Sequence, residues 1–216
     1  MTRFDVEVTI DAIGARGDGV GTVEGTRIYV PYTMVGDRIV ARLGPKRDEA
    51  FTGRLLRLVA AGPGRIEPPC RHFGACGGCA LQHLDEAHYR NWKRELVIEA
   101  LSRRGIAVDT VEALRPAEPA TRRRADLTVV RQADGIRLGL NERSTHRVID
   151  IETCSVLRPV IVAALAPLRA TLALLFRPGE RAEVVINAVE AGLDVLLVTT
   201  AAFGQGGRKR LTELAE

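Results

Sequence analysis

Cys70-Arg-His-Phe-Gly-Ala-Cys76-Gly-Gly-Cys79 holds three of the four cysteines of this 216-residue chain, and Cys154 is the fourth. The spacing C-x5-C-x2-C with one remote cysteine is closer to iron–sulfur sites than to the two cysteine pairs of structural zinc. Glycines within the run allow the backbone to turn around an inorganic core. The spacing favours an iron–sulfur cluster over zinc, and zinc over a disulfide.

Three of the four histidines, His72, His83 and His88, flank the cysteines and are further candidate ligands. Four thiolates are enough for either metal centre, so no histidine ligand is required. The N-terminal sequence has no basic region followed by an apolar run, so it predicts no secretory signal. We therefore expect a cytoplasmic protein without disulfides.

The segment before the cysteines, residues 1–61, predicts a small β-barrel. Apolar and polar residues alternate over 4–10, as in a strand with one buried face. The glycine-rich loop at 14–21 precedes a strand and no helix, so it predicts a hairpin connection with Arg16 at its tip and no phosphate loop. Five short strands suggest an OB-like barrel, which either contacts nucleic acid or serves only for packing. The other four strands are expected at 20–23, 26–30, 37–43 and 51–59.

A second region, residues 62–104, combines a proline- and glycine-rich linker at 61–69, the cysteine loop and a helix at 85–104. Asp85 is the expected N-cap of this helix and Gly105 its end. Residues 105–216 predict a mixed central domain, and the fold class is therefore α+β with a largely antiparallel sheet. Its expected elements are strands at 125–131, 136–140 and 147–151, a helix at 155–176 and a hairpin at 182–189 and 193–199.

The apolar stretch at 159–176 is barely long enough to cross a bilayer, and Arg169 interrupts it, so a buried helix is expected there and no membrane partner. The net charge is +4, with an isoelectric point near 9.1. Part of the basic excess lies in Arg122-Arg123-Arg124. A basic surface of this kind suits RNA, because phosphate neutralisation dominates nucleic-acid affinity.

Two longer runs carry a family resemblance. The first extends from Cys70 through Cys79-Ala-Leu-Gln-His-Leu to Trp92-Lys-Arg, and the second is Arg147-Val-Ile-Asp-Ile-Glu-Thr-Cys154-Ser-Val-Leu. Together they resemble the iron–sulfur subgroup of the bacterial RNA uracil-5-methyltransferases, which use S-adenosylmethionine to make 5-methyluridine in ribosomal RNA. The similarity reaches to about residue 200, and residues 1–61 are similar to the family's TRAM domain.

The resemblance implies that Cys70, Cys76, Cys79 and Cys154 hold a [4Fe–4S] cluster. It places Arg122, Arg123 and Arg124 in an arginine-rich strand that can contact RNA. Arg16, at the tip of the hairpin connection, is a further candidate contact with the RNA backbone, which its position in the loop suggests. Ribosomal RNA is the implied partner, the cluster's role is structural, and the protein is expected to be a monomer.

We find no trace in these 216 residues of the catalytic domain that the resemblance implies. Methylation at C5 of uracil needs a cysteine that attacks C6 and a base that removes the C5 proton. The family carries both, with the S-adenosylmethionine site, in a C-terminal domain. We therefore expect an N-terminal half, truncated at its C-terminus and not catalytically competent alone. A free-standing iron–sulfur or zinc RNA-binding module and an electron-transfer protein are the alternatives.

Overall fold

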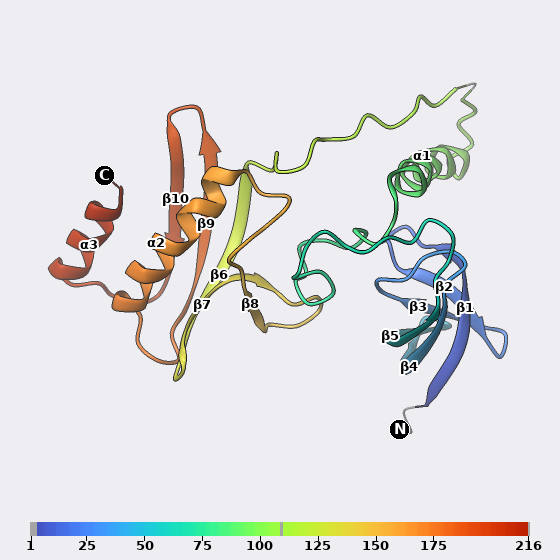
Figure 1. Ribbon diagram of the computed structural model, residues 1–216, viewed down its shortest axis with the longest axis horizontal. Helices are drawn as coiled ribbons and strands as arrows, with labels where there is room; N and C mark the ends of the chain where they lie inside the picture. The colour runs from blue at the N-terminus through green and yellow to red at the C-terminus, as the bar shows by residue number, and fades with distance from the viewer. Residues whose placement is uncertain (1–3, 109, 216) are drawn as a thin grey trace. The chain divides into compact units, whose positions relative to one another are not determined.

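The computed structural model describes residues 4–108 and 110–215, which fall into two compact units (Figure 1). The first unit contains Met1–Pro69 and Cys79–Pro116, and the second contains Cys70–Gly78 and Ala117–Glu216. The chain thus leaves the first unit at Cys70 and returns to it at Cys79. The domain boundaries expected near residues 61 and 104 stay predictions.

The first unit contains a closed barrel, as predicted (Figure 1). The strand order around it is β1-β2-β3-β5-β4, and β4 pairs back to β1. Only the β3–β5 pair is parallel among the barrel strands that the structure describes. The strands are β1 (Asp5–Ile13), β2 (Gly19–Val23), β3 (Thr26–Val30), β4 (Arg38–Arg47) and β5 (Ala50–Ala60).

The barrel core follows from the alternation of apolar and polar residues, because every second side chain of a strand points to the same face. Its buried residues are Val8, Ile10, Ile28, Val30, Ile39 and Ala41. Glu24 and Gly25 both have positive φ angles, 48° and 74°, and join β2 to β3. Such a two-residue turn matches the twist of a hairpin.

Helix α1 (Glu86–Ser102) also belongs to the first unit. It begins as predicted, because the Asp85 carboxylate accepts a hydrogen bond from the His88 backbone N–H at 2.8 Å. Gly105, with a φ of 70°, follows its last turn. The Trp92 indole N–H donates to the Ile13 carbonyl at 3.3 Å, which ties α1 to the barrel.

The second unit is an antiparallel sheet in the order β10-β9-β6-β7-β8, which confirms the expected α+β class. Helix α2 (Pro159–Leu175) lies against it (Figure 1) and buries Ile161, Leu165, Leu168 and Leu172. The strands and the last helix are β6 (Arg124–Gln132), β7 (Gly135–Asn141), β8 (Val148–Asp150), β9 (Arg181–Val189), β10 (Gly192–Val198) and α3 (Gln205–Ala215).

Helix α2 begins four residues later than the predicted start at Ser155. Pro159 lies in its first turn, where a backbone N–H has no partner within the helix, so the N–H that proline lacks is not needed there. The residues before it bond to another segment instead: the Arg122 N–H donates to the Val156 carbonyl, and the Arg158 N–H donates to the Arg122 carbonyl, both at 3.0 Å. Cys154 therefore lies in a loop. Within the described residues no helix has the length and apolar character needed to cross a membrane.

Candidate metal centre

The segment Cys70–Gly78 lies beside the end of β7 in the second unit. Cys76 forms an isolated bridge with Glu142, and the Gly77 N–H donates to the Asn141 carbonyl at 3.0 Å. A Cβ atom on Gly77 would lie 2.7 Å from that carbonyl oxygen, closer than real contacts allow. The glycine after Cys76 is thus needed for this close approach.

Cys76 and Cys154 are half-buried, and both pack against the core of the second unit. Burial raises the pKa of the Cys76 thiol, and the neighbouring Cys70 and Cys154 raise this pKa further. The Gly78 N–H, which donates to Cys76 Sγ at 3.4 Å, and the Arg122 guanidinium oppose that rise. Cys70 and Cys154 are therefore both close enough to Cys76 to affect its pKa.

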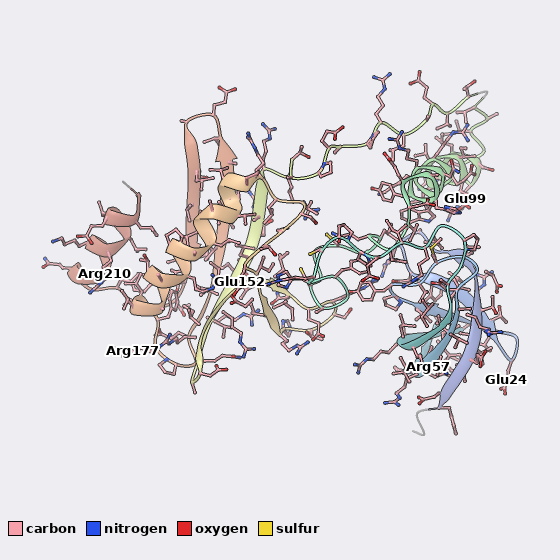
Figure 2. All side chains as sticks on the ribbon, in the orientation of Figure 1. Glu24, Arg57, Glu99, Glu152, Arg177 and Arg210 are labelled. Atoms are coloured by element: carbon pink, nitrogen blue, oxygen red, sulfur yellow. The ribbon has the colours of Figure 1, made fainter. Side chains whose placement is uncertain are left out.

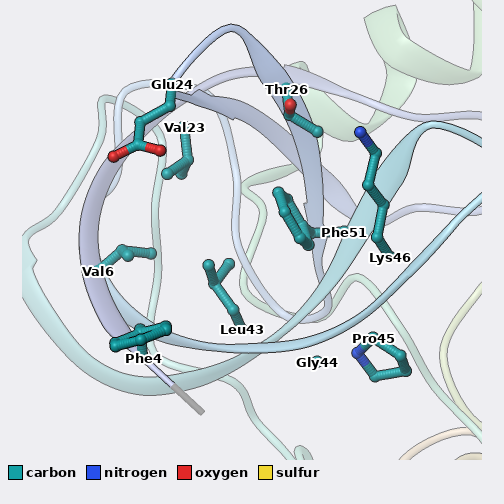
Figure 3. A pocket seen from close by; sticks show the side chains of 10 residues that line it. All are labelled: Phe4, Val6, Val23, Glu24, Thr26, Leu43, Gly44, Pro45, Lys46 and Phe51. Carbon is teal, nitrogen blue, oxygen red and sulfur yellow. The ribbon is translucent and has the colours of Figure 1, made fainter. Parts of the chain in front are cut away.

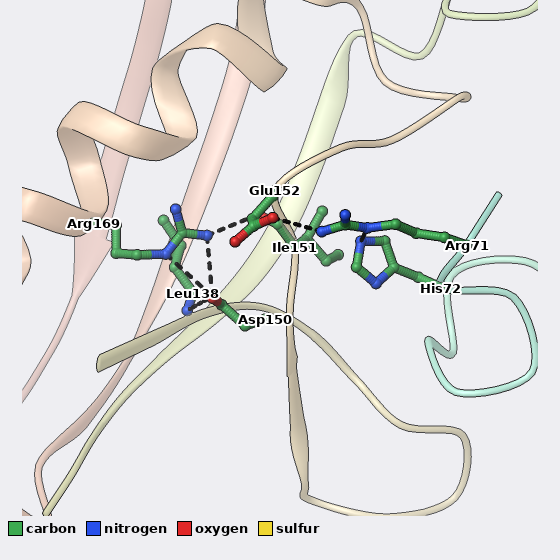
Figure 4. Close-up of polar contacts among 7 residues, drawn as sticks. All are labelled: Arg71, His72, Leu138, Asp150, Ile151, Glu152 and Arg169. Carbon is green, nitrogen blue, oxygen red and sulfur yellow. Dashed lines mark hydrogen bonds and ion pairs between the residues drawn. The ribbon is translucent and has the colours of Figure 1, made fainter. Parts of the chain in front are cut away.

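An ion pair links the two sequence segments that carry these thiols. Arg71 Nη2, next to Cys70, lies 2.5 Å from Glu152 Oε2, two residues before Cys154 (Figure 4). Both side chains are more than half exposed. Pairs of this kind contribute at most about 1 kcal/mol, so the pair favours this arrangement without fixing it.

Arg169 of α2 fixes the chain ahead of Cys154 more firmly. Its Nη2 donates to Asp150 Oδ1 at 3.0 Å and to the Ile151 carbonyl at 2.8 Å (Figure 4). Asp150 Oδ1 also accepts from the Leu138 N–H at 2.8 Å. The sequence signal was a single cation in an otherwise apolar helix, but nothing in the sequence identified its partners.

The base of the cysteine loop is closed in the first unit. The Ile66 N–H donates to the His83 carbonyl at 2.9 Å, and the Asp85 N–H donates to the Gly64 carbonyl at 2.8 Å. Arg65 and Leu84 form an antiparallel bridge between these bonds. The chain therefore leaves for the cysteine loop and returns from it at one place.

A buried ion pair anchors that place to the barrel. The Asp37 side chain is fully buried, and its Oδ2 lies 2.5 Å from Arg65 Nη1. The carboxylate also accepts backbone N–H bonds from Met34 at 2.8 Å and from Gly62 at 2.9 Å. Each buried charge thus has partners, as burial requires. Sequence analysis missed this network because Asp37 and Arg65 are far apart in the chain.

The three candidate histidines have other roles in the structure. His83 is fully buried, and this burial lowers its pKa to about 4. His88 Nδ1 lies 2.8 Å from Asp85 Oδ1 at the start of α1. The His72 carbonyl accepts from the Cys76 N–H at 2.8 Å, which shapes the turn before Cys76.

The cysteines do not form a closed ligand shell here. Within residues 4–108 and 110–215, no group of three or more Cys, His, Asp or Glu side chains is close enough to hold a metal ion. Cys79, also half-buried, is grouped with the first unit, whereas Cys70, Cys76 and Cys154 are in the second. The donor set fits a thiolate-bound centre in one respect: the Gly78 N–H and the Arg122 guanidinium both favour the Cys76 thiolate, against the burial that raises its pKa overall.

The predicted RNA-contacting arginines separate into two sites. Arg122, Arg123 and Arg124 line a cavity of about 630 Å³ together with Asn187 and the end of β9. Arg124 is engaged by Asp126 at 2.8 Å and by Asn187 at 3.3 Å. Arg122 and Arg123 have exposed side chains. Arg16 lies in the first unit, exposed at the turn between β1 and β2.

Comparison with known proteins places this geometry in context. A Brucella suis protein named as an uncharacterized RNA methyltransferase is 40% identical over 208 residues, which cover 96% of this chain and 49% of that protein. A 23S rRNA (uracil(1939)-C(5))-methyltransferase of Halomonas elongata is 36% identical over 175 residues, covering 80% of this chain and 36% of the enzyme. This chain spans about half the length of the Brucella protein and about a third of the length of the Halomonas enzyme. No protein-family model matches it.

A solved structure supports the fold independently. The tRNA (uracil-54, C5)-methyltransferase of Pyrococcus abyssi, in complex with S-adenosyl-L-homocysteine, superposes with a TM-score of 0.63. The superposition covers 94% of this chain and 48% of the archaeal enzyme, at 23% identity. At this identity the likeness establishes the fold alone.

Proposed function

Because this chain is a relative of the RNA uracil-C5 methyltransferases over most of its length, we propose that it forms the iron–sulfur and RNA-binding part of such an enzyme. The full enzyme would transfer a methyl group from S-adenosylmethionine to C5 of a uridine in RNA, with ribosomal RNA as the favoured substrate. The observation that carries the proposal is the 36% identity, over 80% of the chain, to a 23S rRNA uracil-C5 methyltransferase. The barrel would then be the TRAM domain.

Four thiolates, those of Cys70, Cys76, Cys79 and Cys154, would hold the [4Fe–4S] cluster. Such clusters are bound by four cysteines, and the site supplies an N–H donor to sulfur and a nearby cation at Cys76. Methyl transfer to uracil moves no net electrons. The cluster would therefore tie the Cys70–Cys79 loop to the loop at Cys154, an arrangement that the Arg71–Glu152 pair already favours.

C5 methylation needs a thiolate that adds to C6 of the uracil, and a base for the C5 proton. If all four cysteines bind the cluster, none of them is the nucleophile. The isolated chain is thus expected to bind RNA without methylating it.

Arg122 and Arg123 are the candidate RNA contacts of the second unit. Their exposed guanidiniums lie at one cavity beside the end of β9. Arginine forks match the geometry of phosphate oxygens. Arg124 is already paired with Asp126, so its contribution should be smaller.

A binding titration tests the RNA role. The purified chain is mixed with labelled ribosomal RNA fragments at several salt concentrations, and Arg122→Gln/Arg123→Gln is compared with Arg208→Gln, which removes an exposed arginine on α3. We expect the double variant to bind more weakly and to lower the salt slope by about 2 on a duplex segment. The control should match the wild type. Equal binding by all three proteins would remove these arginines from the proposal.

A second assay tests the catalytic assignment. The chain is incubated with methyl-labelled S-adenosylmethionine and the same RNA, and the label in RNA is counted. We expect none. Incorporation of label that survives replacement of each cysteine by serine would show that catalysis does not use a cysteine of this chain. It would overturn the proposal that this chain binds RNA without methylating it.

A further inference from the structure

The barrel has an open end with a cavity of about 800 Å³ in the first unit (Figure 3). Half-buried apolar side chains, Val6, Val23 and Leu43, form part of its lining. Val23 and Leu43 continue the barrel core outward, because both pack against the buried cluster that contains Ile28. The cavity is therefore an apolar recess at the mouth of the barrel.

Aromatic rings are concentrated at this mouth. The chain has five phenylalanines, and two of them, Phe4 and Phe51, line the cavity. Phe51 is half-buried, whereas Phe4 is 61% exposed. An exposed aromatic face beside an apolar recess is the arrangement on which nucleobases stack.

Two charged groups define which part of a nucleotide fits. The Lys46 amine lies 5.9 Å from the centre of the Phe51 ring and can meet a phosphate at the rim. The Glu24 carboxylate also lines the cavity, from the β2–β3 turn (Figure 3). A carboxylate repels phosphate but accepts hydrogen bonds from the N–H groups of a base. The recess therefore favours a base, with its phosphate kept toward Lys46.

Strand β5 continues the basic rim away from the mouth. Arg54 and Arg57 are exposed on this strand, and Figure 2 shows Arg57 directed away from the barrel. Neither has an acidic partner among the described residues, whereas Arg38 pairs with Glu7 and Arg42 with Asp5. Unpaired arginines on an exposed strand are suited to contact successive phosphates.

We propose that the open end of the barrel binds an unpaired nucleobase of the RNA, stacked on Phe4 and Phe51, with the adjoining phosphates on Lys46, Arg54 and Arg57. This inference rests on the proposed RNA function and specifies where the barrel meets its substrate. The turn between β4 and β5, which borders the cavity, corresponds to a loop that OB-type barrels commonly use for oligonucleotides.

The test uses a single-stranded RNA of about twelve nucleotides, within the length that one such barrel covers, and a duplex of the same sequence. Affinities are measured by fluorescence anisotropy for the wild type, Phe4→Ala and Phe51→Leu. Phe203→Leu is the matched control, because Phe203 is a half-buried aromatic residue of the other unit. We expect the wild type to prefer the single strand, and each mouth variant to bind it about ten-fold more weakly.

The arginines are tested through salt dependence. Arg54→Gln/Arg57→Gln should lower the salt slope on the single strand by about 1.4, whereas Arg38→Gln, which removes a paired arginine of the same barrel, should change it less. Circular dichroism of each variant confirms that it is folded.

The outcomes separate the two proposals. If the wild type binds RNA and the folded mouth variants bind equally well, the mouth assignment is overturned while the RNA function stands. Equal affinity for single strand and duplex would also overturn the mouth assignment. If the wild type binds neither RNA, both proposals fail.

Discussion

The two ends of the barrel differ in their side chains: one end has buried polar side chains with partners, and the other has apolar side chains around a cavity. At one end, Asp37 and His83 are fully buried, and the Asp37 carboxylate pairs with the half-buried Arg65 and accepts backbone N–H bonds. At the other end, half-buried apolar side chains and Phe4 border an uncovered cavity of about 800 Å³. The closed end anchors the base of the cysteine loop, while the open end keeps apolar surface available for a ligand. Both come from one small barrel.

The sharpest way to break this contrast is to remove the Asp37 carboxylate. Asp37→Ala leaves Arg65 and two backbone N–H groups without their acceptor. We expect a loss of about 3–5 kcal/mol in the free energy of unfolding, because a buried charge is left uncompensated. Urea unfolding measures this loss.

The control for Asp37 is Asp5→Ala, which breaks the exposed pair with Arg42. Its unfolding midpoint should stay close to that of the wild type. An Asp37→Ala protein as stable as Asp5→Ala would show that the buried pair does not anchor the loop base.

The pH dependence of stability tests the closed end of the barrel, because His83 is buried there. Burial lowers the pKa of His83 to about 4 in the folded chain, from an ordinary value near 6.5. Between pH 4 and pH 6.5, His83 therefore binds a proton in the unfolded chain but not in the folded chain. This contribution to stability is complete above pH 6.5 and is lost as the pH falls toward 4, on the order of 3 kcal/mol in all.

Urea unfolding of His83→Leu against pH isolates this effect. The variant should lose the part of the pH slope that lies between 6.5 and 4, whereas His146→Leu, which replaces an exposed histidine, should keep it. Identical slopes in the wild type and the His83 variant would contradict the assignment.

The two ends of the barrel also differ in how tightly their glycines are packed. A Cβ on Gly62, at the closed end, would lie 2.2 Å from the Val35 carbonyl oxygen, so Gly62→Ala must displace backbone and should cost about 3 kcal/mol. Gly25, at the β2–β3 turn of the open end, has a φ of 74° and no atom within 4 Å of an added Cβ. Gly25→Ala should cost only about 1 kcal/mol, from its backbone conformation. Thermal unfolding in which Gly25→Ala proved the more damaging change would reverse the contrast.

The repeating elements of the fold could be predicted from the sequence, and the isolated polar contacts could not. Alternation in the first strand, the turn at Gly25 and the cap at Asp85 are local signals, and the structure confirms each of them. The start of α2 was predicted too early, because the residues before Pro159 bond to the distant Arg122 segment. Hydrogen bonds between residues so far apart in the chain follow no repeating pattern in the sequence.

The same distinction applies to the candidate site. Cysteine spacing indicated a metal centre, and the structure brings Cys70 and Cys154 close enough to Cys76 to affect the pKa of its thiol. The sequence did not indicate that Arg169 would hold the chain before Cys154, or that Asp37 and Arg65 would close the base of the loop. These supports arise from tertiary packing, which a single sequence does not display.

Metal analysis shows whether Cys70, Cys76, Cys79 and Cys154 hold an iron–sulfur cluster, as we propose. Iron, acid-labile sulfide and zinc are measured per chain after anaerobic purification, for the wild type and for Cys154→Ser. We predict about four irons and four sulfides in the wild type and a marked loss of both in the variant. One zinc without sulfide, or no metal in the folded wild-type chain, would contradict the claim.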